Sequence, residues 1–264
     1  MEPVGVAFLN KKFIICESLK KASDYSCIYY NQANLNKIFS ETISSMKLKN
    51  RDFIITLPTE IVKVSTLIEK TNMRKLKNFD KAITSELSKE LCIDVAENVI
   101  SYKYYIKNDM QGKMLLNAVF APKIKIAEFV KSLGNVSIKA IDIISESLRR
   151  VINYKNDYLI LYFYYDGEEE YVGIFIYRNN FLLAYRCLET CNYDVPKLKM
   201  EIDRAMAFIK SSIKDFSLSK CAIFSDTKGN VEIMLEELQD IKVEAFGVEE
   251  SIAAVASGLC TWGK

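Results

Sequence analysis

The residues that could carry chemistry are few, and their types exclude several classes of enzyme. The chain has no histidine among its 264 residues, which excludes Ser-His-Asp and Cys-His nucleophile systems and histidine-containing metal sites in this chain alone. The closest of its seven cysteines, Cys187 and Cys191, have no second pair to complete a tetrahedral site. We therefore expect no metal site, no catalytic residue and cysteines that remain buried thiols in a reducing compartment.

Phosphate-binding and nucleic-acid-binding signals are also weak. Glycine accounts for only 9 of 264 residues, whereas loops that wrap a phosphate need glycine for close backbone approach. The run of three glutamates at 168–170 falls at an expected turn, so we expect these carboxylates to be exposed to solvent. With 36 basic and 34 acidic residues the formal charge is +2, so the balance gives no electrostatic reason to bind nucleic acid.

Hydrophobic periodicity and turn residues predict alternating strands and helices in the first half of the chain. The expected elements are a hairpin over 1–18, a helix over 33–47, strands over 53–57 and 62–68, a helix over 76–91, strands over 99–106 and 114–120, a helix over 123–133, a strand over 140–144 and a helix over 145–151. The most basic stretch, 63–81, lies within this half, and its simplest interpretation is a solvated face.

The second half repeats this pattern. Its expected elements are strands over 158–164, 171–177 and 181–187, a helix over 195–213, a strand over 221–224, a helix over 231–238, an edge strand over 242–246 and a helix over 249–259. Hairpin strands followed by alternating strands and helices predict an α/β fold of two related domains with mixed sheets. We place the domains at 1–154 and 155–264.

Several motifs, in this order, resemble the PilM family of type IV pilus assembly proteins, which are actin-like and related to the cell-division protein FtsA. The matching stretches are Phe-Ile-Ile-Thr-Leu-Pro at 53–58, Ala-Ile-Thr-Ser-Glu-Leu at 82–87, Leu-Leu-Asn-Ala-Val-Phe-Ala-Pro-Lys at 115–123, Glu-Ile-Asp-Arg-Ala at 201–205 and the Ala-rich, Gly-Leu end at 254–259. The resemblance covers nearly the whole chain. It implies an actin-like (ribonuclease H-like) fold with an inserted subdomain at about 57–121.

The chain departs from this family at the loops that bind nucleotide. The resemblance places Ala7 where active relatives carry a metal-handling Asp, and Leu9 where they carry a second Gly. An expected Gly-Gly pair is replaced by 187–192, and an adenosine-contacting Gly-Gly-Gly by 225–227. The segment between Cys191 and Lys197 is also shorter than in relatives, which implies a reduced subdomain in the second domain. We therefore expect a probable pseudo-ATPase with no cofactor.

The alternative is a diverged actin-like ATPase that uses ATP with magnesium as a switch in pilus or type II secretion assembly. Asp166 or Asp226 would then position the metal, and residues of the first hairpin tip would reach a phosphate. The candidate nucleotide contacts are Asn10, Lys11, Lys12, Asp166, Gly167, Asp226 and Gly229. The competing interpretation of 10–12 and 166–167 is an ordinary hairpin tip.

The resemblance implies a non-enzymatic adaptor at the cytoplasmic face of the cell membrane. Members of the family bind the N-terminal cytoplasmic peptide of a PilN-like bitopic protein in a groove between the first domain and its insert. A pilus motor ATPase or platform protein is a further expected partner, and nucleic acid is not. Basic residues near this groove could meet an acidic partner or anionic lipid, or be a solubilising helix face: Lys63, Lys70, Arg74, Lys75 and Lys77.

Overall fold

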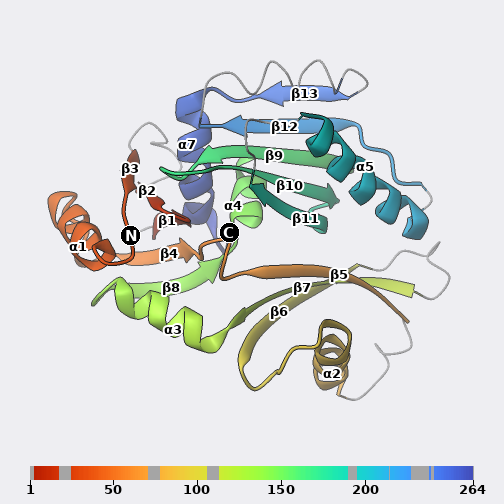
Figure 1. Cartoon of the computed structure of the whole chain (residues 1–264), viewed down its shortest axis with the longest axis horizontal. Coiled ribbons are helices and arrows are strands. Elements are labelled where there is room, and N and C mark those ends of the chain that lie inside the picture. The colour runs from red at the N-terminus through yellow and green to blue at the C-terminus, as the bar shows by residue number, and fades with distance from the viewer. Residues whose placement is uncertain are drawn as a thin grey trace.

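The computed structural model describes residues 3–17, 25–70, 78–105, 113–189, 195–213, 215–226, 238 and 241–263. The first half of the chain forms a five-stranded mixed sheet in the order β3-β2-β1-β4-β8 (Figure 1). Its strands are β1 (Val4–Leu9), β2 (Lys12–Cys16), β3 (Tyr25–Tyr29), β4 (Asp52–Thr56) and β8 (Ser137–Asp142). β2 pairs antiparallel with β1 and β3, whereas β4 pairs parallel with β1 and β8.

The second half repeats this topology strand for strand. Its sheet has the order β11-β10-β9-β12-β13 (Figure 1). The strands are β9 (Asp157–Tyr165), β10 (Glu170–Arg178), β11 (Phe181–Glu189), β12 (Lys220–Ser225) and β13 (Lys242–Ala245). β10 pairs antiparallel with β9 and β11, and β12 pairs parallel with β9 and β13. The two halves are therefore related units with mixed sheets, as the sequence predicts.

Helices cover both faces of the two sheets. The helices of these halves are α1 (Leu35–Ser45), α3 (Lys123–Ser132), α4 (Ile144–Val151), α5 (Val195–Ser212) and α7 (Val248–Ser257), which continues as the 3₁₀ helix η4 (Gly258–Thr261). α1 buries its apolar stripe against the first sheet, where Phe39 lies edge-on to Phe13. α4 and α7 lie between the two sheets (Figure 1), and α7 contacts β1, β2 and β12.

A smaller sheet is inserted between β4 and β8. It consists of β5 (Lys63–Lys70), β6 (Asn98–Tyr105) and β7 (Lys113–Pro122) in the antiparallel order β5-β7-β6. The helix α2 (Phe79–Leu91) covers one face of this sheet (Figure 1), with Ile83 and Leu87 packed in one cluster with Met114 and Leu116. The opposite face of the sheet is turned toward the two halves, which makes this insert a wall of any groove between them.

The structure differs from the predicted elements at a few places. β3 was not predicted, and the strand expected at 140–144 occupies 137–142 instead. β8 ends at Asp142, opposite Thr56, which is the last residue of β4. Ile143 and Ile144 therefore have no strand to pair with, and α4 begins at Ile144. The helix expected at 231–238 lies outside the described residues apart from Leu238. No helix of the described part is long and apolar enough to cross a membrane.

The cysteines follow the expectation in part. Cys16, Cys221 and Cys260 are buried thiols, and burial raises the pKa of the Cys221 thiol above its ordinary value. Cys92 is exposed at the left-handed C-cap of α2, so the expectation that all thiols are buried is wrong for this residue.

Two glycines permit contacts between backbones at the centre of the molecule. A Cβ on Gly258 would overlap the backbone carbonyl of Ser147 in α4, and a Cβ on Gly5 would overlap the carbonyl of Ala256 in α7. Ser147 also donates its hydroxyl to the carbonyl oxygen of Val255 at 2.6 Å. These contacts fix α4, α7 and β1 closely against one another.

We expect Gly258→Ala to lower the free energy of unfolding by roughly 1–3 kcal/mol, because the added methyl group has no room next to rigid backbone. Gly247→Ala is the matched control, since its Cβ would meet only the flexible Glu250 carboxylate at 3.6 Å. Urea unfolding followed by circular dichroism measures both. Equal effects of the two variants would contradict the close-packing argument.

Buried tyrosines of the second sheet predict a loss of stability at alkaline pH. Burial raises the pKa of Tyr162, Tyr164 and Tyr177 well above the ordinary value. Because the pKa is higher in the folded state, the neutral buried tyrosines contribute their full stabilisation below a pH of about 10. This stabilisation is lost as the pH rises further. We expect part of the tyrosinate absorbance at 295 nm to appear only together with loss of the far-ultraviolet circular dichroism. Full ionisation before unfolding would contradict this.

Candidate functional site

A groove separates the inserted sheet from the edge of the first sheet. The cavity in it has a volume of about 400 Å³. Its walls come from β6, β7, β8, α3 and α4, together with the segment after β4 and a residue after η4. The apolar lining residues are Leu57, Val62, Val99, Val119, Phe120, Ala121, Ile126, Ile141, Ile143 and Trp262, and the polar ones are Ser101, Tyr102, Lys103, Asn117, Asp142, Glu146 and Arg150.

Three large apolar side chains of this groove face solvent. Val99 is 48% exposed, Ile141 39% and Trp262 40%, although each comes from a different part of the chain. Exposed apolar side chains scattered singly are ordinary, but several around one cavity are typical of a binding surface. The groove therefore offers apolar area that a ligand could remove from water.

The polar part of the groove contains an ion pair with unused hydrogen-bonding capacity. Arg150 in α4 lies 2.5 Å from the Asp142 carboxylate, measured from Nη2 to Oδ2. The Nη1 atom of Arg150 and the Oδ2 atom of Asp142 are buried without a hydrogen bond, whereas Oδ1 of Asp142 accepts the Ile143 N–H at 2.8 Å. The Arg150–Asp142 pair therefore forms a charged part of an otherwise largely apolar groove wall.

A second charged cluster stands beside this pair. Glu146 of α4 is nearly buried and accepts hydrogen bonds from Lys103 of β6 at 3.0 Å and from Arg149 at 3.1 Å. Burial lowers the pKa of Arg149, but the charge of Glu146 and its hydrogen bond raise the pKa overall. The Lys103–Glu146 pair joins the inserted sheet to α4 across the groove.

The residues predicted to contact a nucleotide come together where the two halves meet. Lys12 of β2 forms an ion pair with Asp226, which directly follows β12, and Lys11 forms one with Glu168 in the β9–β10 turn. Asn10 accepts a hydrogen bond from Thr59 at 2.9 Å. The structure thus brings the first hairpin tip against the second half, with its lysines already paired.

The second-half residues of this set serve mainly as turn and contact residues. Asp166 is buried, and its Oδ1 atom accepts the N–H groups of Glu168 and Glu169, both at 2.9 Å. Gly167 has φ +110°, and the Tyr29 ring lies against it. Gly229 lies outside the described residues. These features match the hairpin-turn interpretation of 166–167 that the sequence analysis left open.

The residues at this contact do not fit a metal-bound phosphate. Ala7 is fully buried in β1, and its side chain offers no ligand atom. The Ala256 carbonyl occupies the space next to Gly5 that a Cβ would fill. Burial raises the pKa of Asp226 above its ordinary value, while the charge and hydrogen bond of Lys12 act in the opposite direction. Asp226 is thus a carboxylate held by an internal lysine. That no nucleotide binds stays a prediction.

Of the five basic residues predicted to contact a partner, the structure describes the side chain of Lys63 alone. Lys63 is exposed at the start of β5 and does not line the cavity. Lys70 ends β5, but its side chain lies outside the described part, as do Arg74, Lys75 and Lys77 entirely. Sequence reasoning missed Arg150, Asp142 and Trp262. The available signal was a helix, α4, whose buried residues include Ser145, Glu146 and Ser147 beside Ile144 and Leu148.

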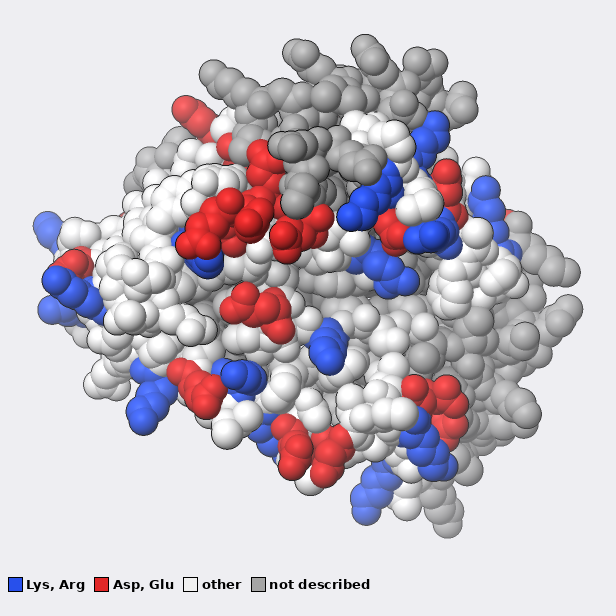
Figure 2. Space-filling view, viewed as in Figure 1, with Lys and Arg blue, Asp and Glu red and all other residues white. Residues whose placement is uncertain are grey.

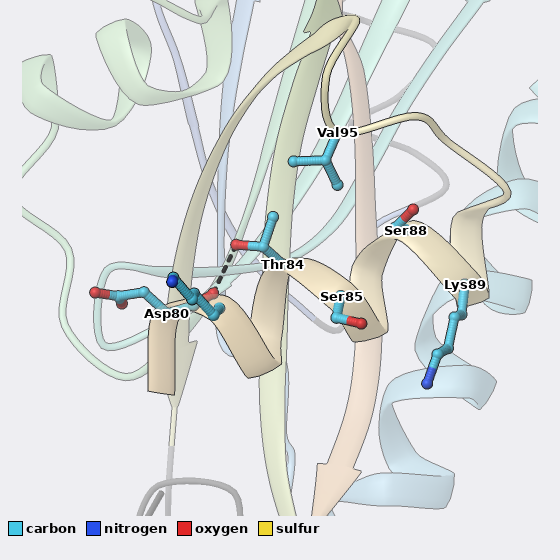
Figure 3. A pocket seen from close by; sticks show the side chains of 7 residues that line it. Asp80, Thr84, Ser85, Ser88, Lys89 and Val95 are labelled. Atoms are coloured by element: carbon cyan, nitrogen blue, oxygen red, sulfur yellow. Dashed lines mark hydrogen bonds between the residues drawn. The ribbon is translucent and has the colours of Figure 1, made fainter. Parts of the chain in front are cut away.

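A further hollow lies over α2 and is shown in Figure 3. It has a volume of about 530 Å³ and is lined by α2 and Val95. Thr84 donates its hydroxyl to the carbonyl of Asp80 within the helix at 2.6 Å, and the other labelled side chains point in different directions. No polar groups converge on a common point among these residues, so this hollow is the weaker candidate.

Comparison with protein-family models gives no match, and neither does comparison with curated proteins. Solved structures do match. A chain of a PilM–PilN type IV pilus biogenesis complex has a TM-score of 0.74 at 13% identity, with 98% of each chain covered. The ethanolamine utilization protein EutJ from Carboxydothermus hydrogenoformans has a TM-score of 0.51 at 10% identity, over 100% of this chain and 90% of that one.

These similarities concern the fold. The chain has the actin-like fold of two related α/β halves with an inserted subdomain, as the resemblance to PilM implies. The division at residue 154 and the insert at 57–121 stay predictions.

Proposed function

We propose that this protein is a non-enzymatic adaptor of a type IV pilus assembly platform. In this proposal it binds the N-terminal cytoplasmic peptide of a PilN-like bitopic membrane protein in the groove between the first sheet and the insert. The observation that carries the proposal is the groove itself, an apolar cavity with the Arg150–Asp142 ion pair in its wall. The fold shared with a chain of a PilM–PilN complex supports the class of partner.

The groove suits an extended segment better than a compact ligand. β8 is an edge strand, and its last residues, Ile141 and Asp142, line the cavity. The free edge of a sheet offers backbone N–H and C=O groups to an added strand, while neighbouring pockets select alternate side chains. A peptide along β8 would place apolar side chains against Val99 and Trp262 and a carbonyl oxygen near Arg150.

Binding through a peptide would hold the adaptor at the cytoplasmic face of the membrane without a membrane segment of its own. A pilus motor ATPase or platform protein is the further partner in this proposal. Nucleic acid is not, because 36 basic and 34 acidic residues nearly balance. On the face in Figure 2 the described basic and acidic residues are interspersed. A nucleotide switch is the alternative function, but the lysines that would reach a phosphate are paired with carboxylates.

The test is calorimetric titration of the protein with a synthetic peptide of the cytoplasmic N-terminal residues of the neighbouring bitopic pilus protein, without nucleotide. We expect saturable binding, and at least about tenfold weaker binding in Arg150→Met/Asp142→Asn, since a hydrogen bond to a charged group contributes about 1.5–3 kcal/mol. The double variant leaves neither charge buried alone. Ile141→Glu, a change at an exposed groove residue, is expected to weaken binding as well.

The matched control is Arg204→Met/Glu201→Gln, which removes an Arg–Glu pair on α5 with 64% of the Arg204 side chain exposed. This variant should bind the peptide as the unmodified protein does. A scrambled peptide controls for composition. Absence of binding at high micromolar peptide contradicts the adaptor proposal, and equal affinities of the groove and control variants would place the peptide elsewhere.

A further inference from the structure

The contact between the two halves is made by residues that the fold brings together from opposite parts of the chain. Lys12 belongs to the first sheet, and Asp226 directly follows β12 of the second. We infer that the Lys12–Asp226 ion pair is an internal clamp, which holds the two halves in one arrangement without a ligand between them. This inference goes beyond the adaptor proposal and does not depend on it.

The burial of the pair shows that it belongs to the structural core of the contact. The side chains of Lys12 and Asp226 are 2% and 3% exposed. Surface ion pairs contribute little to stability because solvent screens them, whereas loss of one partner of a buried pair leaves a charge without compensation. A buried pair that bridges two units therefore opposes any separation of those units.

Further contacts satisfy both charged groups in this position. Asp226 accepts the Tyr165 N–H at 3.0 Å through Oδ1, and its own N–H donates to the Phe163 carbonyl at 3.1 Å. The Lys12 ammonium lies 5.9 Å from the ring centroids of both Tyr29 and Tyr164. Each partner is thus held by its surroundings, so the clamp has a defined geometry.

Neighbouring contacts cross the same boundary. Lys11 reaches Glu168 at the rim, and the Tyr29 ring packs against Gly167. Thr59, which follows β4, lies 3.4 Å from the Tyr164 hydroxyl of β9, measured between the two oxygens. Leu57 of the same segment lines the groove. The contact between the two halves and the groove therefore share one short stretch of chain.

The test is hydrogen–deuterium exchange of the full chain, read by mass spectrometry for peptides that cover 8–12 and 163–168. We expect Asp226→Asn to speed exchange at least tenfold in both peptides. Once the pair is broken, the first hairpin tip and the β9–β10 turn, which are the two tips of this contact, separate. Lys12→Met should produce the same change. The double variant should add little to either single variant, since all three remove one shared interaction.

The matched control is Asp157→Asn, which breaks the buried Arg178–Asp157 pair inside the second half. It should lower the melting temperature as Asp226→Asn does, yet leave exchange of 8–12 at the rate of the unmodified protein. Equal exchange of 8–12 in the two variants would overturn the clamp, because the effect would then be general destabilisation.

A second arm adds millimolar Mg-ATP to the unmodified protein. Unchanged exchange and melting temperature are expected, since the pair occupies the contact. Protection of both tips by Mg-ATP would overturn the inference, as the contact would then admit a nucleotide. None of these measurements uses a peptide partner, so failure of peptide binding and failure of the clamp are distinguishable.

Discussion

The backbone packing of α4 against α7 and η4 is the constraint on which the rest of the molecule depends. Only glycine at position 258 lets η4 approach the carbonyl of Ser147, and α7 in turn contacts strands of both sheets. Because α4 also carries Arg150 into the groove, the same packing sets the position of the groove wall. The groove and the junction of the two halves are thus built on one pair of helices.

Much of the fold could be predicted from the sequence, because its signals are local. The hairpin turns at 166–167 and 179–180 and the apolar stripe of α5 predicted their elements within a few residues. β3 was missed because a short, half-buried edge strand has no clear alternation. Gly5 could not be interpreted correctly either, since its role depends on the Ala256 carbonyl, far away in the sequence.

The candidate site was much less predictable, because it depends on contacts between residues that are far apart in the sequence. Asn10, Lys11 and Lys12 were singled out as possible phosphate contacts, but which carboxylate meets each lysine is decided by how the two halves pack. The groove depends on Arg150 and Trp262, whose neighbours come from the insert and from β8. Residue type indicated charge and apolar area, and only the tertiary structure shows where they converge.

The composition of the groove has a consequence for biosynthesis. Leu57 is synthesised long before Trp262, and both line the same cavity. A chain still growing on the ribosome has an unfinished groove until synthesis has passed Trp262 and η4 has docked. Completion of the groove therefore requires synthesis through Trp262, and a product truncated before this residue would lack part of the groove lining.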